Sequence, residues 1–157
     1  MNRSCRLRAI ALLLIPACSA LQAAGDADPI EGVWDFTVTR RDCAGGAVLG
    51  TQKALSMFQR GGRLSNDNST PPASHGAMFG SWRRGSATHS GTGYVVQMVF
   101  MRFNPDGTLA GTQRVQREMV LAVDGRHLAG SVSAQTLDLA GVVVQRGCAD
   151  EIAVRVF

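Results

Sequence analysis

The stretch that decides the fold runs from residue 93 to residue 138 and reads GYVVQMVFMRF, NPDG, TLAGTQRVQREMVLAV, DG and RHLAGSVSAQTLD. Its three long segments are rich in alternating apolar and polar residues, and a turn sequence separates each from the next. Such alternation is typical of β-strands that bury one face. Asp-Gly pairs suit the positive φ angles of tight hairpin turns. The stretch therefore predicts three consecutive antiparallel strands joined by hairpins.

Segments of the same character lie on both sides of this stretch. The pattern predicts eight strands, over residues 32–41, 53–60, 63–67, 77–84, 93–103, 108–123, 126–138 and 141–157. Only residues 68–75, with Pro71-Pro72, read as a long irregular loop. Short connections predict an up-and-down order, and about eight strands close a small barrel. We therefore expect an all-β, eight-stranded antiparallel up-and-down barrel, formed by a single domain over residues 25–157.

Residues 1–24 resemble a secretory signal peptide. Three arginines precede a short apolar run over residues 9–15, and small residues follow it. Cleavage after Ala23 or Ala24 would release a periplasmic or secreted protein. Alternatively, Ile15-Pro16-Ala17-Cys18 resembles a lipobox, and Cys18 would carry a lipid anchor. We therefore expect an exported protein, with membrane contact only through lipidation at Cys18.

The charge that remains after this leader is small. Three of the 16 Lys and Arg residues lie in the leader, which leaves 13 against 12 Asp and Glu residues. A nearly neutral chain lacks the charge that phosphate backbones attract, so no nucleic-acid partner is predicted. His75, His89 and His127 stand alone, without the spacing of metal ligands. No metal and no other cofactor is therefore predicted.

Cys43 and Cys148 are the two cysteines that follow the leader. In an oxidising compartment they are expected to form a disulfide, the alternative being two free thiols or half of a metal site. The predicted pairing brings the first and last segments together, which would close the sheet and remove its edges.

The disulfide also predicts a register between those two segments. If the cysteines face each other, Trp34 lies opposite Phe157, Phe36 opposite Arg155, and Val38 opposite Ala153. Most of this face is apolar, as a barrel interior should be. Arg155 lies diagonally from Trp34 in this register, and a slip of two residues is the alternative.

Gly32-Val33-Trp34 at the start of the first segment resembles the G-x-W motif of lipocalins and related calycins. In that family an arginine of the last strand packs across the tryptophan at the closed end of the barrel. The resemblance implies this structural role for Trp34 and Arg155. The chain is also similar to small uncharacterised bacterial exported proteins that share the early Trp, the two outlying Cys and a G-T-Q segment. That likeness implies no function.

Candidate ligand-binding residues come from the segments at 93–103 and 108–123. Methionine and aromatic side chains suit an adaptable apolar cavity, and a few polar groups near the barrel mouth would orient a ligand. Core packing explains the apolar members equally well. The candidates are Tyr94, Gln97, Met98, Phe100, Arg102, Gln113 and Arg117.

Strand alternation divides the segment at 108–123 between two faces. Arg114, Gln116 and Glu118 are expected in water, with Arg117 on the inner face near the rim. A buried guanidinium needs an anionic partner, which would be Glu118 or a ligand carboxylate. Of the histidines, His75 is the best candidate for a role, because its long loop is expected to border the open mouth.

The sequence contains no nucleophile elbow and no paired carboxylates typical of glycosidases. We therefore expect a lipocalin-like protein that binds a small, largely apolar molecule inside the barrel. Two alternatives stay open. One is an isomerase or cyclase of the allene-oxide-cyclase-like barrel kind, and the other is a cell-envelope interaction module with a filled core.

Overall fold

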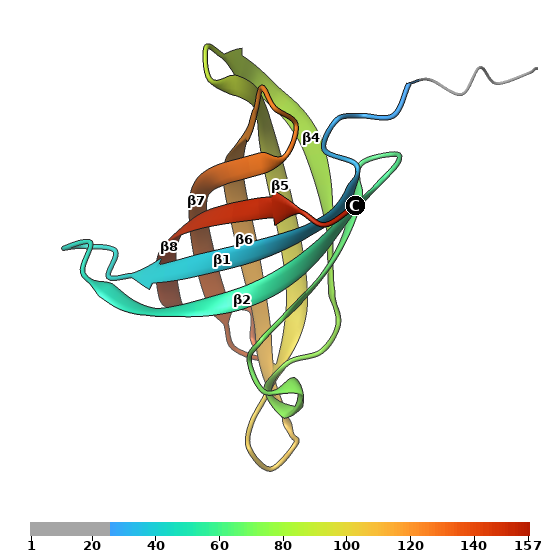
Figure 1. The fold of residues 1–157 in the computed structure, drawn as a ribbon. Coiled ribbons are helices and arrows are strands. Elements are labelled where there is room, and N and C mark those ends of the chain that lie inside the picture. Colours follow the sequence, from blue (N-terminus) through green and yellow to red (C-terminus); the bar gives the residue numbers. More distant parts are fainter. Residues whose placement is uncertain (1–25) are drawn as a thin grey trace, which may run out of the picture.

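The computed structural model describes residues 26–157, so the leader and Cys18 lie outside the described residues. Eight antiparallel strands close into one barrel in chain order (Figure 1). This confirms the predicted all-β up-and-down fold. No helix in the described part of the chain is long and apolar enough to span a membrane. The elements are β1 (Gly32–Arg41), β2 (Val48–Gln59), β3 (Arg63–Asn68), the short 3₁₀ turn η1 (Pro72–Ser74), β4 (Met78–Thr88), β5 (Gly91–Phe103), β6 (Leu109–Ala122), β7 (His127–Leu137) and β8 (Val143–Arg155).

Of the strands that are longer than the sequence predicts, β2 and β4 differ the most. β2 begins at Val48 instead of residue 53, because β1 pairs with it as far as Arg41 opposite Val48. β4 continues to Thr88 instead of residue 84, because it resumes pairing with β5 beyond an irregularity after Arg84. Backbone pairing with a neighbour thus extends strands whose own alternation is weak.

The barrel closes between β1 and β8, as predicted. Cys43 and Cys148 form the expected disulfide, with a Cα–Cα distance of 5.2 Å. The predicted register is wrong by two residues, since Trp34 lies opposite Arg155. Cys43 lies beyond the end of β1, so the disulfide does not impose direct cross-strand pairing of its two residues. Phe157 lies outside the ladder and is exposed.

Arg155 covers Trp34 at one end of the barrel, which we call the closed end. The guanidinium carbon lies 4.4 Å from the centre of the indole ring, a favourable cation–π arrangement. Arg155 also donates hydrogen bonds to the carbonyls of Glu31 (2.7 Å) and Gly125 (3.0 Å). Gly32 has a φ of +133°, and a Cβ there would lie 2.7 Å from the guanidinium. The predicted Trp34–Arg155 contact is confirmed, with the two residues directly opposite and not diagonal.

Residues 28–31 plug this closed end, and Figure 1 shows the N-terminal segment beside the C-terminus. Ile30 is fully buried and accepts a hydrogen bond from the indole nitrogen of Trp34 at 2.9 Å. Asp28 accepts hydrogen bonds from the Tyr94 hydroxyl (2.5 Å) and from Arg84 (2.6 Å). The plug is therefore held to the barrel wall by the Asp28 carboxylate and by hydrogen bonds from Trp34 and Arg155 to its carbonyls.

Asp28 should make the stability of the folded protein depend on pH. Burial alone would raise the pKa of its carboxyl, but the hydrogen bonds from Tyr94, Arg84 and the Ile30 amide outweigh it and lower the pKa below 3.8. A lowered pKa means that the folded protein gains stability from this group above pH 3.8 and loses it as the pH falls through the folded-state pKa. Asp28→Asn should therefore cost about 1–3 kcal/mol at neutral pH and less at acid pH. Urea unfolding of both proteins at pH 7 and pH 3 measures this difference, and an equal gap at both pH values would contradict it.

Candidate ligand-binding site at the barrel mouth

Alternate residues of every strand face the barrel interior. In β5 the inner face carries Tyr94, Val96, Met98 and Phe100, which settles which face of this strand lines the interior. In β6 it carries Arg117 and its alternate neighbours, while Arg114, Gln116 and Glu118 are exposed as predicted. At the closed end these inward side chains pack into an apolar core. It contains Trp34, Phe58, Leu64, Trp82, Tyr94, Met119, Leu121 and Leu128.

In the opposite half of the barrel, several inward-facing side chains are less completely buried. The end of the barrel opposite the closed end is called the mouth. Four connections form it, because alternate turns of an up-and-down barrel lie at the same end; they are residues 42–47, 69–77, 104–108 and 138–142. Several inward-facing residues near this end are only partly buried, although the strand wall surrounds them. The part of the interior that these residues line is called the cup below. These residues are Gln52, Asn68, Phe100, Arg102, Gln113, Val115, Val132 and Ala134.

A buried polar centre lies in the barrel interior, next to the apolar core and the cup. Arg117 on β6 and Glu151 on β8 are almost fully buried, and Arg117 Nε lies 3.5 Å from a Glu151 carboxylate oxygen. The other two guanidinium nitrogens donate to Ser56 Oγ (3.2 Å) and Asn66 Oδ1 (3.1 Å). The guanidinium carbon also lies 4.9 Å from the centre of the Phe36 ring. Ser56, Asn66, Arg117 and Glu151 are called the polar centre below.

The polar centre has hydrogen-bonding capacity that the described residues do not use. Arg117 Nε and both carboxylate oxygens of Glu151 are buried without a hydrogen-bond partner among residues 26–157. Burial raises the pKa of the Glu151 carboxyl and the Arg117 charge opposes this shift, while burial lowers the pKa of Arg117. Buried polar atoms normally have partners, so these three call for water or a polar ligand group.

The structure corrects two predictions about Arg117. The side chain lies deep in the barrel and not near the rim, because three further inward positions of β6, Val115, Gln113 and Gly111, separate it from the mouth. Its anionic partner is Glu151 and not Glu118, which is exposed on the outer face. Glu118 is adjacent to Arg117 in the strand, and adjacent strand residues point to opposite faces.

The loop at 69–77 brings His75 to the mouth, as expected. His75 forms an isolated bridge with Arg102 of β5, and its ring lies edge-on to Phe100 at a centroid distance of 6.0 Å. Its Nδ1 lies 3.0 Å from the Gly76 carbonyl, while Nε2 is buried without a partner in the described chain. One polar atom is therefore free beside the apolar edge of the cup.

Five of the seven candidate residues lie on one continuous inner face. They are Met98, Phe100, Arg102, Gln113 and Arg117. Tyr94 also points inward but lies in the closed end, where its hydroxyl holds Asp28. Gln97 points outward, opposite Gln116 on the outside of the wall, and so lies apart from the others.

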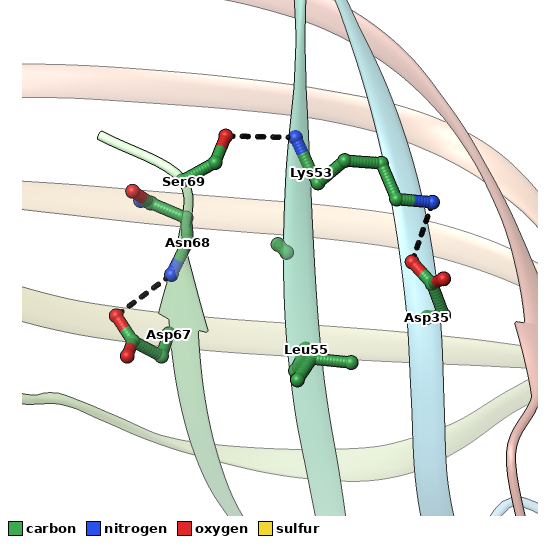
Figure 2. A pocket seen from close by; sticks show the side chains of 7 residues that line it. Asp35, Lys53, Leu55, Asp67, Asn68 and Ser69 are labelled. Atoms are coloured by element: carbon green, nitrogen blue, oxygen red, sulfur yellow. Dashed lines mark hydrogen bonds and ion pairs between the residues drawn. The ribbon is translucent and has the colours of Figure 1, made fainter.

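Two hollows are found on the outside of the barrel. One, of about 330 Å³, crosses β1, β2 and β3 (Figure 2). There the Lys53 ammonium forms an ion pair with Asp35 at 2.6 Å, and the backbone amide of Lys53 donates a hydrogen bond to the Ser69 hydroxyl. The other, of about 670 Å³, crosses β4 to β7 and includes Gln97 and Arg114. Both are lined mainly by outward-facing residues, although Asn68 of the cup also borders the first and Val115 the second.

Sequence reasoning missed three of the four residues of the polar centre. The period-two rule that places Ala153 inside the barrel also places Glu151 inside, so this signal was present in the last strand. Ser56 and Asn66 carry no such signal, because small polar residues are common on exposed strand faces.

The described residues contain no group of three or more His, Cys, Asp or Glu side chains that could hold a metal ion. Comparisons with protein-family models, with curated proteins and with solved structures found no match.

Proposed function

We propose that this protein is an exported, lipocalin-like barrel that binds a small, largely apolar molecule in the cup. The observation that carries the proposal is the partial exposure of inward-facing residues in the mouth half, beside a closed half that is fully packed. A molecule entering between the four mouth loops would meet Val115, Val132 and Phe100 as apolar walls. The polar side chains of the lining are Gln52, Asn68, Arg102 and Gln113. Apolar walls combined with polar groups that orient the ligand are typical of small-molecule sites.

Export is part of this proposal. The disulfide between Cys43 and Cys148 is compatible with an oxidising compartment, where such bonds persist. The signal-like leader supports the same location. We propose a periplasmic or secreted protein, with a lipid anchor at Cys18 as the alternative.

Filling the cup should abolish binding without changing the outer wall. Ala134 faces the cup from β7, whereas its neighbour Ser133 is exposed on the outer face. We expect Ala134→Trp to lower ligand affinity at least about tenfold, because the indole would occupy the space of the ligand. Ser133→Trp is the matched control and should leave affinity unchanged. Native mass spectrometry and isothermal titration calorimetry with straight-chain eight-carbon ligands measure both.

The other outcomes separate the remaining alternatives. If neither the wild type nor Ser133→Trp binds any of these ligands, the envelope interaction module is favoured and the proposal fails. A change in the mass of the released ligand would favour the isomerase or cyclase. Equal loss of binding in both tryptophan variants would place the site on the outer wall and contradict the cup.

A further inference from the structure

Arg117 and Glu151, which we call the floor of the cup, carry buried polar atoms whose hydrogen-bonding capacity is not used within residues 26–157. Arg117 has 5% of its side chain exposed and Glu151 has none, yet one guanidinium N–H and both carboxylate oxygens have no hydrogen-bond partner. Leaving such atoms unsatisfied costs several kcal/mol in a folded protein. Arg117 lies opposite Val132 in the β6–β7 ladder, and Val115 is its neighbour on the inner face of β6; both valines are partly buried residues that line the cup.

The charges at this floor cancel. Arg117 and Glu151 form one ion pair, and their other neighbours, Ser56 and Asn66, are neutral. No second carboxylate or guanidinium is paired with either residue in residues 26–157. A ligand that brings its own charge would therefore face one like charge at close range in a region of low dielectric, where repulsion is strong.

The free atoms also define hydrogen-bonding requirements. The two Glu151 oxygens need a donor, and Arg117 Nε needs an acceptor. A hydroxyl or primary amide supplies both. A carboxylate supplies only acceptors, and an ammonium supplies only donors.

We propose that the polar centre selects ligands whose buried end is an uncharged donor and acceptor, a hydroxyl or primary amide, over carboxylates and amines of the same length. This inference rests on the proposed function, because it assigns the head group of the ligand in the cup. It replaces the ligand carboxylate considered from the sequence, since Glu151 already supplies the anion that Arg117 needs.

Calorimetric titration of the wild-type protein at pH 8 with 1-octanol, octanamide, octanoate and octylamine tests the inference. We expect the alcohol and the amide to bind at least about tenfold more tightly than the two charged ligands. Heptyl methyl ether has the length of octanol but no donor, and it should bind more weakly than octanol. Octanoate binding as tightly as octanol, and blocked by Ala134→Trp, would overturn the inference while keeping the proposed function. Failure of all five ligands to bind would overturn both.

A charge variant supplies a second, independent readout. Glu151→Gln removes the negative charge and leaves Arg117 uncompensated, so the preference should invert and octanoate should bind more tightly than octanol. Asp150→Asn is the matched control, because Asp150 is the adjacent residue on the outer face, where it pairs with Arg41. Its ligand preference should equal that of the wild type, and a preference that stays unchanged in folded Glu151→Gln would contradict the proposal. If Glu151→Gln does not fold, the wild-type ligand series decides alone.

Discussion

Replacing Cys43 and Cys148 with serine is expected to lower the free energy of unfolding by about 4–5 kcal/mol. The bond closes a loop with a sequence separation of 105 residues, and a loop of this size restricts the unfolded chain by about that amount in the chain-entropy model. The disulfide also joins the β1–β2 connection to β8 next to the end of the β1–β8 ladder. Urea unfolding of the oxidised wild type and the double serine variant measures the difference.

Two controls accompany this experiment. Reduced wild type and the single variant Cys43→Ser should match the double variant, because each lacks the same cross-link. A loss below about 1 kcal/mol would contradict the prediction and would show that the β1–β8 ladder and the Trp34–Arg155 contact close the barrel without the disulfide.

Glu151→Leu is expected to cost about 3–5 kcal/mol, because it leaves the Arg117 charge buried without its anion. Denaturant unfolding of the variant measures the loss.

The double variant Arg117→Met/Glu151→Leu is the informative comparison. With both charges removed, an apolar centre of similar volume should recover most of the lost stability, so that the double variant is more stable than Glu151→Leu. Asp150→Asn breaks only the exposed Arg41–Asp150 pair and should cost less than about 1 kcal/mol. A double variant less stable than Glu151→Leu would contradict the assignment of Arg117 and Glu151 as a compensating buried pair.

The β5–β7 region shows how far local sequence goes in this protein. Alternation in residues 93–138 correctly assigned three strands, because the side-chain period of a strand depends only on its own backbone. Asp124-Gly125 marked a real turn, with Gly125 at a φ of +67°. The inner face of β6 was also assigned correctly, but the depth of the Arg117 side chain in the barrel was not.

The candidate site was predicted only in part, for a related reason. Met98, Phe100 and Arg117 share one face because they belong to two neighbouring strands with recognisable alternation. Ser56 and Asn66 reach the same centre from β2 and β3, and Ser56 is separated from Arg117 by 61 residues. No local sequence pattern indicates that a serine so far away along the chain will accept a hydrogen bond from a buried arginine.

By itself, the sequence determined the strand order, the turns, the barrel class and the disulfide, since each follows from alternation, from glycine conformation or from the count of cysteines. Tertiary structure decided the β1–β8 register, the choice of Glu151 over Glu118 and the difference in burial between the apolar core and the residues of the cup. The physical reason is that alternation specifies the face to which a side chain points. Its partner across the barrel depends on how distant strands align, and the packing of Trp34, Arg155 and the plug at residues 28–31 sets that alignment at the closed end.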